Sequence, residues 1–295
     1  MSPRVILITG ATAGIGRHAA LGLARRGHHV IATGRKADAL AALKAEAGGV
    51  RLDVVTLDVN DPASIQAAYT EVQRLTAGRG VDALINNAGY GQMGAVLDVA
   101  DDAVHAQFDT NVHGLLRVTR AFAPDMIRRG SGRILNVSSV GGRMVFPMAG
   151  VYHATKYAVE ALSDALRLEL APHGVQVVVI EPGAIRTRFG ETAVASLGHA
   201  APASSPWGPA YAITDAVMSR YESLAPDPTA VTHAMATAIE SARPRARYVA
   251  PWYNTLMIAV ATRLPTWLFD LVLRAPFGLT ASRLRRPALP GPGAA

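Results

Sequence analysis

Two kinds of hydrophobic pattern alternate along most of the chain. Short runs of aliphatic and β-branched residues are typical of buried strands, and longer segments with apolar residues every three or four positions are typical of amphipathic helices. Strands are expected at residues 5–9, 29–33, 52–57, 82–85, 133–137, 175–180 and 247–250. Helices are expected at residues 14–26, 36–47, 101–129, 151–171 and 228–242, and a further helix opens at Asp61-Pro62. Strands that alternate with helices in this way predict an α/β fold with a doubly wound parallel sheet and helices on both faces.

A less regular pattern follows the sixth expected strand. Residues 188–228 are rich in Ala, Pro, Ser and Gly, and we expect an irregular segment there that lies over the ligand site as a lid. Two short apolar helices are expected near the end of the chain, at residues 253–260 and 266–273. The pattern predicts a single Rossmann-type domain with the following boundaries: domain 1–286, carboxyl-terminal helical extension 251–286 and flexible tail 287–295.

The composition excludes several kinds of site. The chain has 295 residues and no cysteine, which excludes disulfides, thiolate metal sites and cysteine nucleophiles. Its nine histidines show no HExxH spacing, so we expect no metal site. The net charge of +7 comes without a basic stripe or interleaved aromatic residues, so we expect no nucleic-acid partner. This charge favours anionic ligands or an acidic membrane surface.

The apolar stretches at both ends of the sequence are short. The first ten residues, MSPRVILITG, lack the hydrophobic region and cleavage site of a secretory signal. Residues 248–262 are uncharged and apolar but fall short of the roughly 20 residues of a spanning helix. We therefore expect a soluble, cytoplasmic protein with no transmembrane segment. For the apolar helices at 253–273, three roles stay open: packing in the core or in an oligomer, covering the ligand site, and peripheral contact with a membrane.

The first expected strand leads through a glycine-rich turn, TGATAGIG, into the first helix. Glycines allow a tight turn and a close approach of the backbone to a diphosphate, which the amino terminus of a helix attracts. Taken alone, three glycines are equally consistent with an ordinary turn, but the strand–turn–helix context favours a nucleotide. The expected nucleotide-binding residues of this turn are Gly10, Thr12, Ala13, Gly14, Ile15 and Gly16.

The end of the second expected strand carries a cation where a carboxylate would favour NAD(H). The residues there are Gly34-Arg35-Lys36, with no acid to accept hydrogen bonds from a ribose 2′-hydroxyl. A guanidinium is suited to a 2′-phosphate, and Arg17 is a candidate second cation. The alternative is an exposed Arg-Lys pair at a helix start. The pattern predicts NADP(H) as cofactor in preference to NAD(H).

Three further strand ends carry residues suited to the same cofactor. Each has a simpler reading: a carboxylate at a helix start for Asp58-Val59, a turn for the NNAG segment, and a turn for Pro182-Gly183. The functional readings are an acceptor for the adenine amino group, close packing against the cofactor, and backbone exposed to the nicotinamide. The candidate cofactor-binding residues are Asp58, Val59, Asn87, Ala88, Gly89, Pro182, Gly183, Ile185 and Thr187.

A serine, a tyrosine and a lysine form the candidate catalytic group. Tyr152 and Lys156 are four residues apart in an expected helix and so lie on one face of it. Ser139 follows the preceding strand and is expected to face both side chains. A cation beside a phenol lowers its pKa from about 10, which produces a proton donor and acceptor for neutral pH. Asn111 lies in the middle of a helix, either as a buried, satisfied amide or as the point where the helix opens to bind a water.

In combination these motifs resemble the short-chain dehydrogenase/reductase family, in its compact single-domain branch. The likeness covers roughly residues 4–190 and consists of TGATAGIG, NNAG, a helical asparagine, a serine thirteen residues before YxxxK, and PGxxxT. It implies an NAD(P)-dependent oxidoreductase with Ser139, Tyr152 and Lys156 as the catalytic centre and Asn111 assisting, and with Tyr152 and Lys156 also touching the cofactor. Ser138 matches the neighbour of the catalytic serine. The resemblance also implies a homo-oligomer.

The substrate is expected to be a small hydrophobic ketone, aldehyde or alcohol. Apolar residues near the candidate centre are suited to line its pocket, although core packing is an alternative for some of them: Met144, Val145, Phe146, Met148 and Trp207. Two other functions are possible for a protein with these motifs, and each predicts a different sequence feature. A non-catalytic NADP(H)-sensing protein would not need the complete Ser–Tyr–Lys–Asn set, and an epimerase or dehydratase of this architecture would carry a larger substrate domain.

Overall fold

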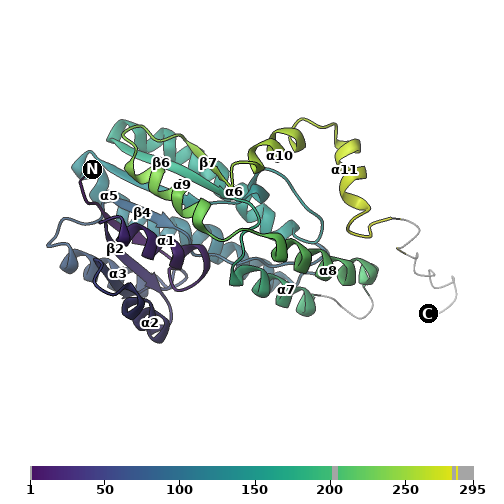
Figure 1. Cartoon of the computed structure of the whole chain (residues 1–295), viewed down its shortest axis with the longest axis horizontal. Helices are drawn as coiled ribbons and strands as arrows, with labels where there is room; N and C mark the ends of the chain where they lie inside the picture. The colour runs from purple at the N-terminus through teal and green to yellow at the C-terminus, as the bar shows by residue number, and fades with distance from the viewer. Residues whose placement is uncertain (1, 201–204, 281–283, 285–295) are drawn as a thin grey trace.

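A computed structural model describes residues 2–200, 205–280 and 284. Its centre is one sheet of seven parallel strands in the order β3-β2-β1-β4-β5-β6-β7 (Figure 1). The strands are β1 (Val5–Ile8), β2 (His29–Gly34), β3 (Leu52–Thr56), β4 (Ala83–Asn86), β5 (Gly132–Val137), β6 (Val175–Pro182) and β7 (Arg247–Ala250). The strand order reverses between β1 and β4, and ligands of doubly wound sheets bind beyond the carboxyl ends of the strands at such a point. The predicted fold class is confirmed.

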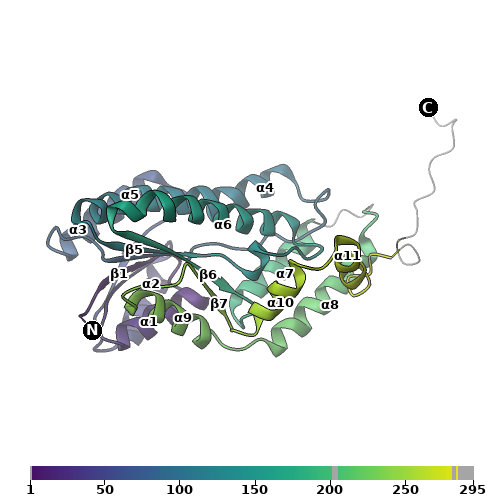
Figure 2. The same ribbon diagram turned by 90° about the horizontal axis from the view of Figure 1, so that it is seen from above.

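Helices cover both faces of the sheet. One layer consists of α1 (Gly14–Arg25), α2 (Ala37–Ala47) and α9 (Thr229–Glu240), and the opposite layer of α3 (Pro62–Leu75), α5 (Leu115–Arg129) and α6 (Gly150–Leu170). Figure 2 shows the two layers above and below the strands. Each strand supplies side chains to both layers, because successive residues of a strand point to opposite faces.

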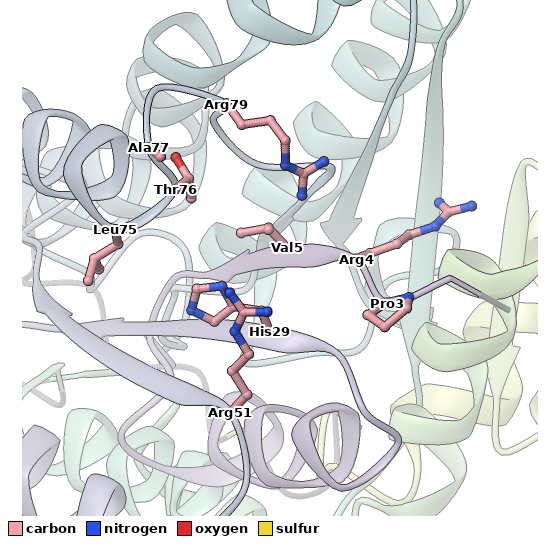
Figure 3. Close-up of a pocket in the computed structure, with 9 residues that line it drawn as sticks. All are labelled: Pro3, Arg4, Val5, His29, Arg51, Leu75, Thr76, Ala77 and Arg79. Carbon is pink, nitrogen blue, oxygen red and sulfur yellow. The ribbon is translucent and has the colours of Figure 1, made fainter.

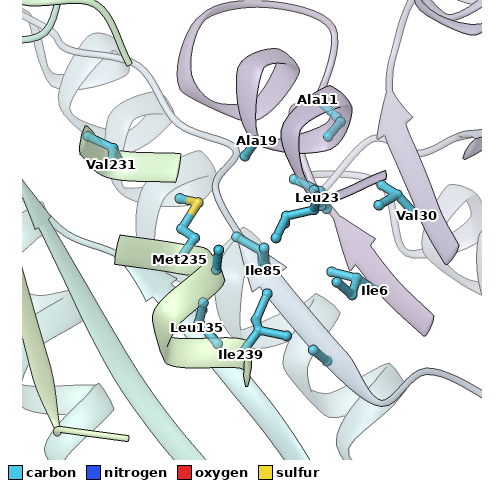
Figure 4. Close-up of a cluster of buried hydrophobic side chains, with 14 of the residues drawn as sticks. Ile6, Ala11, Ala19, Leu23, Val30, Ile85, Leu135, Val231, Met235 and Ile239 are labelled. Carbon is cyan, nitrogen blue, oxygen red and sulfur yellow. The ribbon is translucent and has the colours of Figure 1, made fainter. Parts of the chain in front are cut away.

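Strand β1 illustrates this alternation. Ile6 and Ile8 pack with the α1 and α9 layer, while Val5 and Leu7 pack with the α3 and α5 layer. Figure 4 shows Ile6 in its cluster with Leu23 of α1, Ile85 of β4 and Ile239 of α9. A strand buried on both faces needs a continuous apolar run, which is the pattern that the sequence shows there.

Helix α3 begins as the Asp-Pro pair predicts. The Asp61 Oδ1 atom accepts a hydrogen bond of 2.9 Å from the Ala63 N–H, and Pro62 occupies the first helical position. A side-chain acceptor at the N-cap satisfies a backbone donor that has no partner inside the helix.

The segment expected as one long helix is continuous but changes its winding. It consists of α4 (Asp101–Phe108), a π-helical segment (Asp109–Gly114) and α5. A π-segment adds a residue to the turn and widens it, and such segments are frequent at functional sites. Asn111 lies within this segment, so the helix is locally wider at this residue.

The expectation of an irregular segment at residues 188–228 is wrong. Two helices occupy most of it: α7 (Arg188–Ala200) and α8 (Gly208–Leu224). The small residues of this stretch are mostly alanines, which favour helix more than any other residue. Buried Ala193 and Ala210 are among the residues through which α7 and α8 pack onto the rest of the protein.

The carboxyl-terminal extension contains α10 (Asn254–Ala261) and α11 (Thr266–Arg274), close to the expected bounds. Both helices lie at the end of the molecule beyond the carboxyl ends of the central strands, as Figures 1 and 2 show. Within the described ranges, no helix combines the length and the apolar composition needed to cross a bilayer. The predicted tail at 287–295 lies outside the described residues.

Candidate active site

Strand β5 delivers two serines to the carboxyl edge of the sheet. Ser138 is buried, and the Ser139 Oγ accepts a hydrogen bond of 3.0 Å from the Gly141 N–H. The same hydroxyl donates to the Pro182 carbonyl at the end of β6, at 3.4 Å. Ser139 is therefore held between the ends of two neighbouring strands.

Helix α6 brings Tyr152 and Lys156 to this edge. Tyr152 lies in the first turn and hydrogen-bonds to Ser139. The Lys156 Nζ lies 5.8 Å from the centroid of the Tyr152 ring and donates a 2.9 Å hydrogen bond to the Val137 carbonyl. The predicted convergence of hydroxyl, phenol and ammonium is thus present in the structure.

The pKa values of the two α6 groups differ from the sequence-based expectation. Burial raises the pKa of the Tyr152 phenol to about 12, and the hydrogen bond with Ser139 only partly opposes that shift. Burial also lowers the pKa of the Lys156 ammonium to about 8, while the negative charge of Glu160 opposes the shift. The phenol pKa is therefore shifted upward, opposite to the expected direction, because the loss of water around the phenol is the largest influence on it.

Asn111 reaches this centre through the π-segment. Its Nδ2 donates 3.0 Å hydrogen bonds to the Tyr90 carbonyl and to the Thr155 Oγ1, and its Oδ1 accepts from the Tyr90 N–H at 3.2 Å. Thr155 directly precedes Lys156 on α6. Asn111 is therefore a buried amide whose hydrogen bonds are satisfied. It also lies in the π-helical segment, where the helix is wider.

The glycine turn after β1 is packed against the end of β4. The Asn87 Nδ2 donates to the carbonyls of Thr9 and Gly10 at 2.9 and 3.1 Å, and a Cβ at Gly16 would overlap both this amide and the Gly10 carbonyl. Gly14 has φ +53°, a conformation in which a side chain is strained. The predicted NNAG and glycine-turn segments therefore form one unit.

The residues of this unit fit a dinucleotide. Helix α1 begins at Gly14, and its N-cap, Ala13, makes no side-chain hydrogen bond to the first turn, which contains no acid. The first N–H groups of α1 are consequently available to a diphosphate. Thr187 lies against Gly14 from the β6 side, so the turn and the PGxxxT segment are direct neighbours at the carboxyl edge of the sheet.

The candidate phosphate-binding arginines differ in their surroundings. Arg35 is exposed directly after β2, and its positive charge partly opposes the rise in the Tyr90 pKa that burial causes. Arg17 is exposed on α1 and forms an ion pair with Glu46 of α2. Arg35 therefore lies close to the segment that follows β4, whereas Arg17 is already paired with a carboxylate.

Comparison with known proteins now decides the family. A family model described as short chain dehydrogenase matches residues 4–197. An oxidoreductase of Escherichia coli K12, YbbO, is 34% identical over 269 residues, which are 91% of this chain and 93% of that protein. The chain belongs to the short-chain dehydrogenase/reductase family.

Individual relatives of this short-chain dehydrogenase act on carbonyl or alcohol groups. Human 17-beta-hydroxysteroid dehydrogenase type 1 is 42% identical over 206 residues, which are 66% of this chain but only 61% of the human protein. A solved short-chain dehydrogenase of Streptomyces avermitilis superposes with a TM-score of 0.76 at 31% identity and covers 94% of this chain and 97% of its own. The protein is thus an oxidoreductase of the class that acts on alcohol and carbonyl groups.

Solved structures also support a nicotinamide dinucleotide cofactor. A Burkholderia phymatum member in complex with NAD has a TM-score of 0.76 at 25% identity and covers 98% of both chains. An actinorhodin polyketide ketoreductase variant with NADPH has a TM-score of 0.71 at 31% identity, over 84% of this chain and 95% of its own. Both forms of the cofactor occur among these relatives, so they do not decide between NAD(H) and NADP(H).

The remaining candidate cofactor residues lie at strand ends and turns near the same edge of the sheet. The Asp58 Oδ1 accepts a 2.9 Å hydrogen bond from the Asn60 N–H after β3. Gly89 lies beside the Asn111 amide, and Gly183 packs against Asn254 of α10. The others also sit at these strand ends and turns: Thr12 beside Gly34, Ile15 and Ile185 against the α1-side core, Val59 beside Gly114, and Ala88 beside Gly10.

The residues expected to line a substrate pocket divide between two clusters. Met148 and Trp207 pack in the cluster that contains Tyr152, together with Phe189 and Tyr211. Met144 and Phe146 instead pack with Ile258 of α10, and Val145 is exposed. The first cluster therefore borders the candidate reacting group, and the second joins the extension to the loop between β5 and α6.

His153 is a residue of the site that sequence reasoning passed over. It is 4% exposed, and burial lowers the pKa of its imidazole to about 4, so it is neutral at pH 7. Its Nδ1 accepts a 3.1 Å hydrogen bond from the Phe146 N–H, and its ring fills the space beside Gly141. His153 therefore links the Phe146 end of the loop between Ser139 and Tyr152 to the Gly141 end of the same loop. Its position beside Tyr152 in YxxxK was a usable signal.

We expect His153→Leu to raise the KM for the substrate and to lower the free energy of unfolding by about 1–3 kcal/mol, because the Phe146 N–H is left buried without an acceptor. His153→Asn should restore most of both quantities, because its Oδ1 can accept the same hydrogen bond. Denaturant unfolding and steady-state kinetics of the two variants test this role. Equal losses in both variants would show that ring packing, not the hydrogen bond, matters.

A hollow of about 280 Å³ lies at the opposite, amino-terminal edge of the sheet (Figure 3). Arg4, His29, Arg51 and Arg79 are among the residues that line it, and Arg79 forms a double hydrogen bond with Asp82 at 2.8 Å. Because Ser139 and Tyr152 lie beyond the carboxyl ends of the strands, this hollow is separate from the candidate centre.

Proposed function

We propose that this short-chain dehydrogenase is an NADP(H)-dependent oxidoreductase that interconverts a hydrophobic ketone or aldehyde and the corresponding alcohol. The observation that carries the proposal is the buried Tyr152 phenol, hydrogen-bonded to Ser139 and adjacent to Lys156, at the same carboxyl edge of the sheet as the glycine turn. Proton transfer at this phenol is suited to accompany a hydride transfer.

The cofactor supplies or accepts the hydride when bound. In the reducing direction, the hydroxyl of Ser139 donates a hydrogen bond to the substrate carbonyl oxygen and orients it. The Tyr152 phenol donates a second hydrogen bond to that oxygen and then its proton. With a pKa of about 12, the phenol stays protonated across the neutral range, so it is ready to donate.

Lys156 serves this transfer through its charge. Its ammonium lies beside the phenol and stabilises the phenolate that forms when the proton leaves. We also propose that Lys156 binds the hydroxyl groups of the nicotinamide ribose of the cofactor. Asn111, which holds the neighbouring Thr155, is proposed to anchor a water that returns protons to Lys156.

The cofactor preference follows from Arg35. An exposed guanidinium after β2, in a position without a carboxylate, favours the 2′-phosphate of NADP(H). Arg35→Asp should shift the ratio of kcat/KM values for NADPH over NADH by about 10- to 100-fold toward NADH, since a charge-assisted contact is lost and a repulsion gained.

The matched control for this prediction is Arg25→Asp. Arg25 is also an exposed arginine, but it lies at the far end of α1. Its replacement should leave the cofactor ratio unchanged. If the ratio did not change in Arg35→Asp either, the 2′-phosphate would have to be bound by other residues.

The substrate side of the site supports an apolar substrate. The Tyr152 cluster is built from Met93, Met148, Phe189 and Trp207, with α7 and α8 lying over it. The Tyr211 hydroxyl of α8 donates a 3.0 Å hydrogen bond to Asp98 and accepts one of 3.1 Å from the Ala95 N–H. We propose that these two helices form the lid over the substrate, and we expect the active form to be a homo-oligomer.

A cofactor-coupled screen tests the proposed function. Loss of NADPH absorbance is followed with a panel of apolar ketones and aldehydes, and its gain from NADP⁺ with the matching alcohols, each repeated with NAD(H). Ketone-dependent oxidation of NADPH supports the proposal. Tight NADPH binding without turnover of any member would instead indicate a nucleotide-sensing protein.

A further inference from the structure

The carboxyl-terminal extension carries most of the exposed large apolar side chains of the described residues. Of the twelve large apolar side chains that are exposed in the described residues, seven lie between positions 252 and 272. We call them the outer face of the extension: Trp252, Tyr253, Leu256, Val260, Trp267, Leu271 and Val272. Trp252 is 81% exposed and Trp267 68%. Isolated exposed apolar residues are normal, but a group of this size marks an interaction surface.

The other side of the extension is already used for packing. Ile258 is buried, and Met257, Ala261 and Phe269 pack with Val140 and Met144 of the loop between β5 and α6. This contact fixes α10 and α11 to the protein without the outer face. The outer face is therefore not the core side of a displaced helix, and its apolar residues need another explanation.

The chemistry of the outer face matches the boundary between water and lipid. Tryptophan and tyrosine are enriched at membrane interfaces, where an apolar ring can be buried while its polar edge stays hydrated. Helix α11 has no buried residue, although six of its nine residues are large and apolar. It is too short to span a bilayer but suited to lie within its surface.

Charge distinguishes between a membrane and a second copy of the chain. Residues 251–295 contain five arginines and one acid, Asp270, and so contribute four of the seven net positive charges. Arg263 and Arg274 flank α11. In a two-fold dimer through this face, the positively charged surface would lie opposite a partner surface of the same charge. An anionic lipid surface attracts these arginines instead.

We propose that the outer face of the extension docks on an anionic membrane surface. The inner side of the same extension packs on the loop that leads from Ser139 to Tyr152, and Asn254 packs on Gly183. A docked protein thus has the substrate side of its site next to the lipid. From this placement we infer that the natural carbonyl substrate is dissolved in the membrane. This inference rests on the proposed function.

Vesicle binding tests the docking independently of catalysis. The wild-type protein is sedimented with vesicles of phosphatidylcholine alone and of phosphatidylcholine mixed with phosphatidylglycerol. We expect binding to the anionic vesicles, weakened at high salt, and a loss of about tenfold or more in the variant Trp252→Ser/Trp267→Ser. The control variant is Leu97→Ser/Leu168→Ser, which removes two exposed apolar side chains elsewhere and should bind as wild type.

Two outcomes would overturn the docking proposal. One is equal binding by the tryptophan variant and the wild type. The other is absence of vesicle binding together with a dimer, seen by sedimentation velocity, that the tryptophan variant abolishes, since that would make the outer face a contact between two copies.

Activity measurements distinguish a failure of the docking proposal from a failure of the proposed function. The tryptophan variant should reduce a water-soluble ketone as fast as wild type but turn over a ketone dissolved in anionic vesicles more slowly, by a factor close to its loss of binding. Vesicle binding without turnover of either ketone would contradict the proposed function and leave the docking intact. Equal turnover of the vesicle-bound ketone by both proteins would contradict the delivery of substrate from the membrane.

Discussion

Replacement of Tyr152 by phenylalanine is expected to lower kcat for ketone reduction by about 10²- to 10⁴-fold, the range typical of a positioned proton donor. The change removes one oxygen and keeps the ring, which packs against Phe189 with centroids 5.4 Å apart. The fold and the affinity for NADPH should therefore be nearly unchanged. Single-turnover reduction and NADPH titration by fluorescence separate the two quantities.

Tyr157→Phe is the matched control for this variant. Tyr157 also lies on α6, but it is 43% exposed, whereas Tyr152 is only 8% exposed. Loss of the Tyr157 hydroxyl should leave kcat unchanged. Full activity of Tyr152→Phe would exclude the phenol as proton donor, and a similar loss in both variants would point to a general effect on α6.

Lys156→Met is expected to lower kcat by about 10²-fold or more, because it removes a preorganised positive charge next to the developing phenolate. Methionine fits a buried position that lysine occupies with 7% exposure, so the cavity is retained. The Val137 carbonyl loses its 2.9 Å donor, and a thermal melt will show how far the fold is affected.

The pH dependence provides a separate readout of Lys156. Because burial lowers the pKa of its ammonium to about 8, the charge is present below that pH and is lost above it. The rate of reduction by the wild-type enzyme should therefore fall as the pH rises through about 8. In Lys156→Met, this fall should be absent from what activity remains. Retention of the same fall in the variant would assign it to another group.

Much of the fold could be predicted from the sequence because its signals are local. Apolar runs such as residues 5–9 and 133–137 are bounded by glycine or charge, and each became a strand within about a residue of its expected ends. The Asp61-Pro62 start of α3 also depends only on neighbours in the sequence. The prediction of an irregular conformation at 188–228 was wrong because it treated all small residues as turn formers, although Ala193 and Ala210 are buried helix residues.

The candidate site was predictable to the extent that spacing determines geometry. The i, i+4 spacing places Tyr152 and Lys156 together on α6, and the end of β5 presents Ser139 to them. The pKa of about 12 for Tyr152 could not be predicted, because it results from burial by segments distant in sequence, such as Phe189. The link between His153 and Phe146 likewise depends on how the loop folds back. The chemical roles of these residues stay predictions.

Transfer of deuterium from the cofactor to the product tests the proposed hydride transfer. NADPH that carries deuterium at both positions of its hydride-donating carbon is incubated with the protein and the best ketone of the panel, and the product alcohol is analysed by mass spectrometry. We expect one deuterium on the new carbinol carbon for each NADPH oxidised, with nearly complete loss of product in Tyr152→Phe. An unlabelled alcohol, or NADPH oxidation without any alcohol, would contradict the proposed hydride transfer.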